Sequence, residues 1–491
     1  MRKLILVLAL LCASTPAMST AAGEPPAQAT PAAATASRST AVAEEMSAEA
    51  LKSALAHHVK GLTVDEARLR AHVIKPQHIV GVTSDRGLEE GKVQFARKKS
   101  GAAAPHVDVN AFGQALHNHL KDEVAGYVMR LRQHGKTIYT LEWNWARTPV
   151  DGSEGWNPQR QMHVASVSKL ITAIALTRLL QEQGKTVDAK IIDFLPTSWS
   201  KGANIDKISF RHLLTHTSGF APTETDYSTM KAAVAAGVNT LGNYSYRNMN
   251  YGLCRILMAV LNGNVSKNAN LTDPMWDFLT ILAYDQFVQT KVFLPSGVTT
   301  ATLFHPASGV LAYNFPITSG GWDSGDLESV SGGAGWHLSA DQLLDVMGTV
   351  RRKGTIVSPT AAQAMLDDRF GIDLIADTPA GKLYNKNGLW HDGGAGSRTE
   401  QSLAYFLPDD MELVVLLNSP LGNPEEFFRG TVTQIFLDSF PDAISAAQKA
   451  AQQQACLAQC GADQQACLKD AAPNEKSACV QEYKQCQKSC K

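Results

Sequence analysis

The stretch HVASVSKLITAIALTRLL, residues 163–180, places two serines and a lysine directly before a run of apolar residues. The apolar run predicts a buried helix, and an ordinary helix needs only one capping serine at its start. Ser166 and Lys169 stand three residues apart, so their side chains lie on nearly the same face of the first turn. The spacing therefore brings a hydroxyl and an amine within reach of each other.

This pair has the chemistry of an activated nucleophile. A serine hydroxyl reacts poorly at neutral pH unless a base lies within hydrogen-bond distance. A lysine can be that base when burial and neighbouring charge keep its amine neutral for part of the time. The helix N-terminus adds backbone N–H groups that can hold an oxyanion. The first turn can thus supply the nucleophile Ser166, its base Lys169 and half of an oxyanion hole.

The alternative is a capped helix whose lysine extends its amine to solvent. The same Ser-x-x-Lys spacing recurs at Ser198/Lys201 and Ser228/Lys231. Both of these pairs lie in polar stretches, and only the pair at 166 and 169 opens a strongly apolar helix. The spacing alone therefore leaves both interpretations open.

A second motif is Tyr246-Arg247-Asn248, within YSYRNMNYGLC at residues 244–254. A phenol beside a Ser–Lys pair can relay a proton to a leaving group, and an amide can hold a substrate carbonyl. The alternative is a loop tyrosine followed by an asparagine-stabilised turn.

A third motif is LWHDGGAGSR, residues 389–398, where His391-Asp392-Gly393 is predicted at a strand edge lining a cleft. Gly393 has no side chain, so a substrate backbone can lie against such a strand. The N–H of Gly394 can complete the oxyanion hole, and His391 can bind a carboxylate or tune the lysine. The alternative is a glycine-rich loop without a role in catalysis.

The rest of the pattern predicts an α/β fold built from both ends of the chain. Asp108 caps a predicted helix, and residues 125–145 alternate around His134-Gly135 as in a β-hairpin. Residues 402–419 repeat the hairpin pattern, and a helix at 424–440 follows. The largely helical stretch from 170 to about 290 would form an inserted lobe, with a cleft between the two parts.

The segments HVASVSKLIT, ISFRHLLTHTSGF, YSYRNMNYGL and WHDGGAGS occur in the order found in the penicillin-recognising serine hydrolases. Residues 108–440 resemble the branch that contains class C β-lactamases, D-alanyl-D-alanine carboxypeptidases, D-aminopeptidases and related esterases. The resemblance implies a β-lactamase-like fold, an antiparallel sheet flanked by helices plus an inserted helical lobe, and no metal or organic cofactor. The roles it implies are an acyl-accepting Ser166, its base partner Lys169, a proton-relaying Tyr246, a substrate-positioning Asn248 and a strand motif at His391-Asp392-Gly393.

The third motif departs from the β-lactamases of this branch, which usually have lysine where we place His391. Lys386-Asn387-Gly388 is a nearby competitor for the position. We favour His391 because the glycine turn and the second hairpin follow it at the expected distance. The departure argues against an efficient β-lactamase and not against acyl-enzyme chemistry.

The N-terminus predicts export. Arg2 and Lys3 precede the apolar stretch LILVLALLCAS and small residues, which is typical of a signal peptide over residues 1–19. Lipid attachment at Cys12 is the alternative, although Leu11 is larger than such sites prefer. Residues 20–43 are rich in Ala, Pro and Thr and predict a disordered linker, and residues 44–107 form an N-terminal extension. We expect a periplasmic or secreted protein.

Six of the eight cysteines fall in the last 36 residues, with gaps of 4, 7, 12, 7 and 4. Residues 470–475, DAAPNE, provide a break between two helices, so residues 446–491 predict a disulfide-linked helical hairpin. Zinc is the competing interpretation, but the spacings do not match zinc pairs and export favours disulfides. The mirror symmetry favours the nested pairs Cys456–Cys490, Cys460–Cys486 and Cys467–Cys479.

Composition excludes some functions. The formal net charge of -1 provides no electrostatic footprint for nucleic acid, and no segment after the N-terminus predicts a transmembrane span. His212 and His216 have a spacing compatible with a metal, but a helix end is the better interpretation. Cys254, outside the hairpin, predicts a buried thiol.

The sequence thus predicts an exported serine hydrolase that cleaves a small ester, a D-amino-acid-type amide or peptide, or a β-lactam. The rival hypothesis is a non-catalytic envelope binding protein that retains the same pocket, with the hairpin as a docking module for an envelope partner.

Overall fold

A computed structural model describes residues 55–65, 68, 106–393, 396–421 and 428–441, together with scattered positions between 453 and 487. The predicted signal peptide, the linker and most of the N-terminal extension lie outside the described residues, so those predictions are not tested. In the part that is described, no helix combines the length and apolar character needed to cross a membrane.

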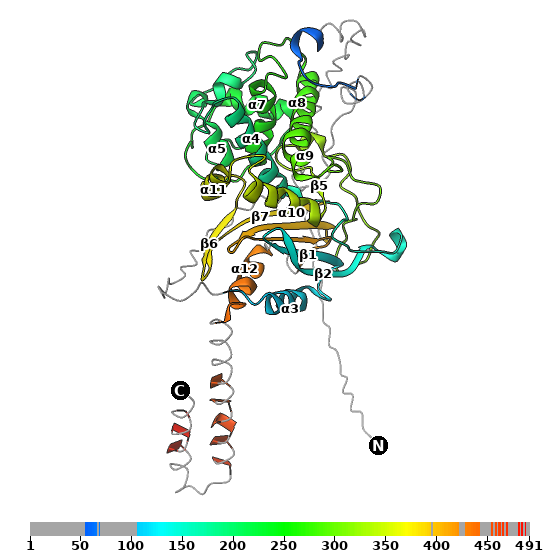
Figure 1. The fold of residues 1–491 in the computed structure, drawn as a ribbon, viewed down its shortest axis with the longest axis vertical. Helices are drawn as coiled ribbons and strands as arrows, with labels where there is room; N and C mark the ends of the chain where they lie inside the picture. The colour runs from blue at the N-terminus through cyan, green and yellow to red at the C-terminus, as the bar shows by residue number, and fades with distance from the viewer. Residues whose placement is uncertain are drawn as a thin grey trace, which may run out of the picture. The chain divides into compact units, whose positions relative to one another are not determined.

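A seven-stranded antiparallel sheet forms the centre of the fold, in the order β3-β2-β1-β9-β8-β7-β6 (Figure 1). The strands are β1 Gly126–Gln133, β2 Lys136–Arg147, β3 Glu154–Gly155, β6 Leu374–Thr378, β7 Gly381–His391, β8 Thr399–Leu407 and β9 Met411–Leu417. A separate pair joins β4 Met162–His163 to β5 His337–Leu338.

The two predicted hairpins are confirmed, and they meet at the centre of the sheet. β1 turns into β2 at His134-Gly135, and β8 turns into β9 at residues 408–410. β1 then pairs with β9 along its length, from Tyr127 opposite Leu417 to Gln133 opposite Met411. The chain therefore builds one sheet from both of its ends, as the sequence predicts.

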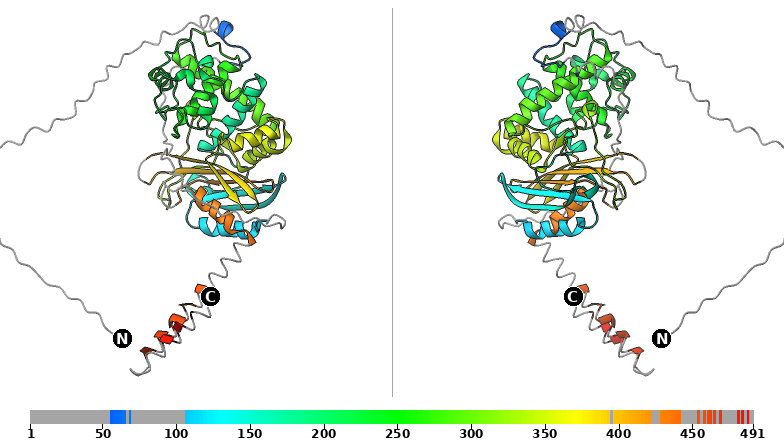
Figure 2. Two further views of the ribbon diagram at one scale, coloured as in Figure 1. Left: turned by 90° about the vertical axis from the view of Figure 1, so that its left-hand side faces the viewer. Right: turned by 90° about the vertical axis from the view of Figure 1, so that its right-hand side faces the viewer.

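Helices cover both faces of this sheet (Figure 2). On one face lie α3 Val109–Leu120, capped by Asp108 as predicted, and α12 Arg429–Asp438. The opposite face carries α10 Ala340–Gly348, which packs on β9 and β1, and the helical lobe stands beyond it. The other helices are α4 Ser168–Glu182, α5 Phe210–Leu214, α6 Tyr227–Ala236, α7 Asn248–Leu261, α8 Asp273–Val288, α9 Leu294–Ser296 and α11 Pro359–Asp367.

The main apolar core lies between the sheet and the helices α3 and α12. Phe112 and Phe436 meet edge to face there, with ring centroids 5.6 Å apart, and Leu116, Met129 and Val415 are fully buried around them. Burial of this apolar surface is what holds the two terminal helices to the sheet.

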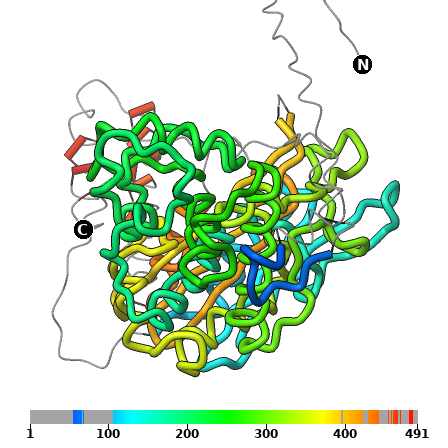
Figure 3. The backbone as a smooth tube through the Cα atoms, turned by 90° about the horizontal axis from the view of Figure 1, so that it is seen from above, coloured from blue at the N-terminus to red at the C-terminus, as the bar shows by residue number. Residues whose placement is uncertain are grey.

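A short part of the N-terminal extension lies along the helical lobe (Figure 3). Val59 forms a β-bridge with Val265, and Lys60 N donates to Asn264 O at 2.9 Å. Further along, the backbone of Thr63 is hydrogen-bonded to the side chain of Gln286. This segment therefore belongs to the folded unit.

The cysteine-rich segment is described only at scattered helical positions. Cys460 is buried and disulfide-bonded, whereas the other five cysteines of the segment lie outside the described residues. No disulfide joins two described cysteines, so the structure does not support the nested pairing, which stays a prediction. Cys254 is a free and fully buried thiol, as predicted.

A buried polar layer lies beneath the start of α4. The rings of His163 and His337 are 5.3 Å apart, and both residues are fully buried. Gly335 N donates to Nε2 of His163, so a neutral ring carries its proton on Nδ1 and donates it to Glu400 Oε2, 3.2 Å away. Burial lowers the pKa of His163 and His337 and raises the pKa of Glu400.

These histidines make the fold sensitive to acid. Burial lowers the pKa of His337 from 6.5 to about 3. Between these two pH values the histidine is protonated in the unfolded chain and neutral in the folded chain. Stability should therefore fall below pH 6.5, by about 1.4 kcal/mol per pH unit for one such group. In urea unfolding between pH 4 and 7, His337→Gln should flatten this slope by about 1 kcal/mol per pH unit. The exposed control His134→Asn should leave it unchanged, and equal slopes in both variants would contradict the assignment.

Candidate active site

Ser166 lies in a tight turn, the 3-10 helix Ala165–Val167, directly before α4. Ala165 adopts a left-handed backbone with φ of +46°, which costs a residue with a side chain about 1 kcal/mol. Two hydrogen bonds hold the preceding Val164: its N donates to Trp336 O at 2.9 Å, and its O accepts from Ser402 Oγ at 2.6 Å. The surrounding structure thus fixes a strained turn that presents Ser166.

Ser166 does not cap the helix. Neither α4 nor the preceding turn has a side-chain capping hydrogen bond, and Ser166 Oγ instead accepts from Lys169 Nζ at 2.9 Å. The Ser166 residue is 6% exposed and Lys169 is fully buried. The helix-cap alternative is therefore wrong for this serine.

Lys169 is held by oxygens from three separate segments. Besides Ser166, its Nζ donates to Asn248 Oδ1 at 2.6 Å and to the backbone oxygen of Gly333 at 2.7 Å. Asn248 is the first residue of α7, and Gly333 follows the short 3-10 helix Glu328–Val330. Three donors on an ammonium group meet three acceptors, which is what a buried amine requires.

Tyr246 faces the same amine. Lys169 Nζ lies 4.9 Å from the centre of the Tyr246 ring. On this ring packs the imidazole of His216, with centroids 4.3 Å apart. Nδ1 of His216 accepts from Arg247 N, so the histidine fixes the backbone next to the tyrosine as well as its ring. Burial, together with the charges of Lys169 and Lys386, holds the pKa of His216 well below its ordinary value and keeps it neutral.

The second lysine at this site is Lys386, in the middle of β7. Its Nζ lies 3.4 Å from the Tyr246 hydroxyl and 2.7 Å from Asp373 Oδ1. The other oxygen of Asp373 accepts from Asn387 N at 3.2 Å, so one carboxylate fixes both the side chain and the strand. Burial lowers the pKa of Lys386, and the negative charge of Asp373 opposes that shift.

β7 also passes directly beside the serine. A Cβ at Gly388 would lie 2.4 Å from Val164 O and 2.9 Å from Ser166 N, closer than atoms pack. Only glycine therefore allows the strand this close to the serine turn and to the Ser166 N–H.

The geometry favours Lys386-Asn387-Gly388 over the His391-Asp392-Gly393 motif that we preferred from the sequence. His391 is the last residue of β7, and its Nδ1 accepts from the nearby Gly393 N at 3.1 Å. Burial lowers its pKa, and the charge that acts against this shift is that of Asp392. A Cβ at Gly393 would meet open space, and Gly394 lies outside the described residues.

The remaining sequence candidates have local structural roles. Lys201 donates to the backbone oxygen of Pro196, and Lys231 pairs with Asp273, so neither repeats the contact between Ser166 and Lys169. His212 forms a capping box with Ser209 at the start of α5, whereas His216 packs on Tyr246. The two histidines thus serve different elements.

Sequence reasoning missed Gly333, Asp373 and His216 as parts of this site. Gly333 acts through a backbone oxygen, which no residue type reveals. Asp373 becomes relevant only through the pairing of β6 with β7, which places Leu374 opposite Asn385. His216 belongs to RHLLTHTSGF, one of the segments that carry the family resemblance. That resemblance was the signal that could have placed His216 near the site.

Substitution of the two rival residues, Lys386 and His391, separates the two assignments. Lys386→Met removes the charge beside Tyr246 and should slow labelling of Ser166 by a fluorophosphonate at least tenfold. His391→Gln should change the labelling rate less than threefold, because His391 makes its contacts at the far end of the strand. The rate is read by intact-protein mass spectrometry. A larger loss of labelling rate in His391→Gln than in Lys386→Met would support His391 as the residue of the third motif.

Comparison with known proteins agrees with this fold. A family model described as Beta-lactamase matches residues 112–436. Among curated proteins, none matches the sequence significantly. Similar folds include the octameric penicillin-binding protein homologue from Pyrococcus abyssi, with 15% identity, TM-score 0.52, and 71% of this chain and 81% of that chain covered.

FmtA from Staphylococcus aureus shares 17% identity with TM-score 0.52, covering 71% of this chain and 93% of that chain. A Beta-Lactamase/D-Alanine Carboxypeptidase from Pseudomonas syringae shares 15% identity with TM-score 0.52, covering 67% of this chain and 98% of that chain. At such low identities these structures support the fold alone, and the match to the family model supports membership of the family. The chain belongs to the β-lactamase family.

Proposed function

We propose that this protein is an exported serine hydrolase that cleaves a small ester or a D-amino-acid-type amide through an acyl-enzyme on Ser166. The observation that carries the proposal is the contact of Lys169 Nζ with Ser166 Oγ, at 2.9 Å, inside a buried cluster that includes Asn248 and faces Tyr246. Family membership supports the same reaction class.

The first step follows from the hydrogen bonds of Lys169. When the amine has lost one proton, two hydrogens remain for Asn248 Oδ1 and Gly333 O, and its lone pair faces Ser166 Oγ. The hydroxyl then donates to Nζ, and the proton moves to the lysine as Ser166 attacks the substrate carbonyl. The two fixed acceptors thus orient the lone pair toward the nucleophile.

The leaving group needs a proton in return. Tyr246 is suited to supply it, because its ring faces Lys169 and its hydroxyl lies 3.4 Å from Lys386 Nζ. Two ammonium groups stabilise the negative charge that the phenol oxygen acquires when it gives up its proton. Lys169 then returns the proton to Tyr246, and water releases the acyl group in the second half of the reaction.

The carbonyl oxygen of the substrate becomes negatively charged during the attack. Ser166 N lies beside Gly388 of β7, whose missing side chain lets the strand backbone approach the serine turn closely. We assign one oxyanion donor to Ser166 N and the second to a backbone N–H of β7 beside Gly388. An extended substrate could then lie along the same strand.

A covalent probe tests the nucleophile. The mature protein is incubated with a penicillin and, separately, with a fluorophosphonate, and the adduct is located by peptide mapping. We expect an adduct on Ser166 that is absent in Ser166→Ala and slowed at least a hundredfold in Lys169→Met, because the serine and its base act as a unit. Ser228→Ala, with the same Ser-x-x-Lys spacing, is the matched control and should label normally.

The release rate of the adduct then separates hydrolytic turnover from trapping. Folded protein that forms no adduct with either probe would favour the rival, a binding protein that retains this pocket without catalysis.

Export and the disulfide hairpin are parts of the same proposal. The signal-like N-terminus and the clustered cysteines support them, since disulfides persist in oxidising compartments. Expression in an exporting bacterial host should yield a protein that begins near residue 20. Non-reducing peptide maps should show Cys456–Cys490, Cys460–Cys486 and Cys467–Cys479. A retained N-terminus or another pairing would refute the corresponding part.

A further inference from the structure

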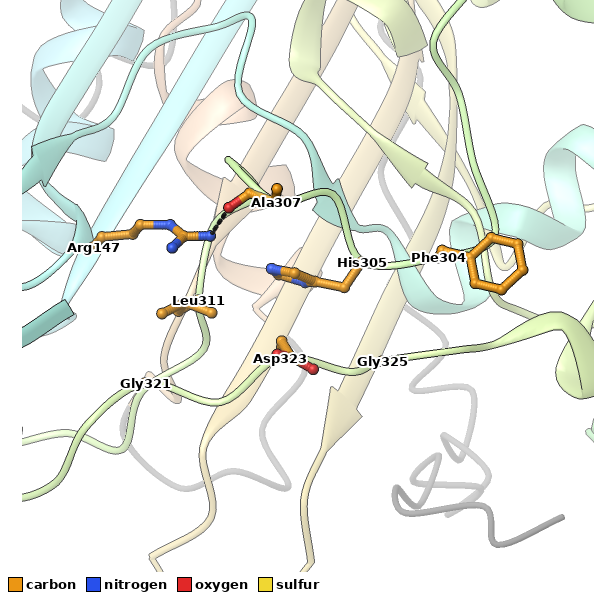
Figure 4. A pocket seen from close by; sticks show the side chains of 8 residues that line it. All are labelled: Arg147, Phe304, His305, Ala307, Leu311, Gly321, Asp323 and Gly325. Carbon is orange, nitrogen blue, oxygen red and sulfur yellow. Dashed lines mark hydrogen bonds between the residues drawn. The ribbon is translucent and has the colours of Figure 1, made fainter. Parts of the chain in front are cut away.

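A polar cavity of about 500 Å³ lies outside the Ser166 site (Figure 4). It opens between two antiparallel segments of the chain, residues 304–312 and 321–326. The side chains of Arg147, His305 and Asp323 line it, together with the apolar Phe304 and Leu311. None of these residues takes part in the chemistry proposed for Ser166. The volume falls in the range of small-molecule sites.

The walls of this cavity are fixed at both ends. β-bridges join Phe304 to Asp326 and Ala312 to Trp322, so the two segments separate only between these points. His305 N also donates to Gly325 O at 2.9 Å. A cavity bounded in this way exists before a ligand arrives, which reduces the entropy that binding costs.

Arg147 forms part of one wall and retains binding capacity. Its Nε donates to Gly309 O at 2.8 Å and one terminal nitrogen donates to Ala307 O at 2.7 Å. These bonds hold the guanidinium against the loop, as Figure 4 shows for Ala307. Its other terminal nitrogen has no acceptor in the described part of the chain. A carboxylate is the group that such a nitrogen binds best.

Asp323 supplies the opposite charge. Its side chain is exposed, and within the described residues it has neither a hydrogen bond nor an ion pair. The ring of His305 lies beside both groups, next to the guanidinium of Arg147 and above Asp323 in the view of Figure 4. Both ring nitrogens of His305 are buried without a hydrogen-bond partner among the described residues. Burial lowers the pKa of His305, so the side chains that line the cavity are one positive group, one negative group and a neutral imidazole beside them.

We propose that this cavity binds a small zwitterion, the head group of a free amino acid or the two ends of a short peptide. Its carboxylate pairs with Arg147 and its ammonium with Asp323, while Leu311 contacts its side chain. A simple anion would meet the carboxylate of Asp323, and a simple cation would meet the guanidinium of Arg147. A molecule that has both charges can pair with the guanidinium of Arg147 and with the carboxylate of Asp323 at the same time. The proposal does not depend on catalysis by Ser166.

Isothermal titration calorimetry on the Ser166→Ala protein tests this site without turnover. The zwitterionic probes are L-leucine, D-leucine and leucyl-leucine. Two truncated probes complete the set: N-acetylleucine, which lacks the ammonium group, and leucine amide, which lacks the carboxylate. We expect saturable binding of a zwitterion and at least tenfold weaker binding of both truncated probes. Tighter binding of leucyl-leucine than of leucine would assign the site to peptide ends, and the reverse would assign it to free amino acids.

Asp323→Asn should weaken zwitterion binding at least tenfold. Glu142→Gln, which removes another exposed carboxylate on the strand that carries Arg147, is the matched control and should bind normally. Thermal unfolding verifies that both variants fold. The proposal is overturned by the absence of saturable binding, by equal affinity in both variants, or by equal binding of N-acetylleucine and leucine. Saturable binding of N-acetylglucosamine, without any binding of the zwitterions, would overturn it in favour of a carbohydrate site.

Discussion

The arrangement of this protein depends on one buried amine. Lys169 is fully buried, and removing an ammonium group from water costs several kcal/mol unless its donors are satisfied. The three acceptors come from the serine turn, from α7 and from the loop at Gly333. These segments must therefore meet at one point, which fixes the helical lobe against the start of α4. The cost of burial explains why the site needs acceptors within hydrogen-bond distance of each N–H of Lys169, and not only polar residues nearby.

β7 connects this helical arrangement to the sheet. Gly388 allows the strand to approach the Ser166 turn, and Lys386, two residues earlier, reaches the Tyr246 hydroxyl. Asp373, immediately before β6, fixes that lysine from the neighbouring strand. The position of a single strand thus sets both the backbone beside the Ser166 N–H and the charge beside the phenol. Both would shift together if the register of β7 changed by one residue.

The sequence predicted those parts of the structure that depend on local patterns. Asp108, the turn at His134-Gly135 and the paired Ser166 and Lys169 each have a signature within a few residues. β7 has none, because eight of its residues are buried in succession and the usual alternation of polar and apolar positions disappears. Because the sequence did not reveal this strand, the choice between His391 and Lys386 depended on their distance along the chain from the second hairpin, which favoured His391. The contact that decides between them depends on tertiary structure.

The charges around Tyr246 show why the site tolerates two lysines. Lys169 and Lys386 lie 4.9 and 5.0 Å from the centre of its ring, and such close cations repel each other. Asp373 compensates one of them, and His216 adds no third charge because burial and both lysines keep it neutral. One positive charge then remains uncompensated by these groups. The cluster is therefore suited to negative charge that appears on the phenol oxygen or on the substrate during the reaction.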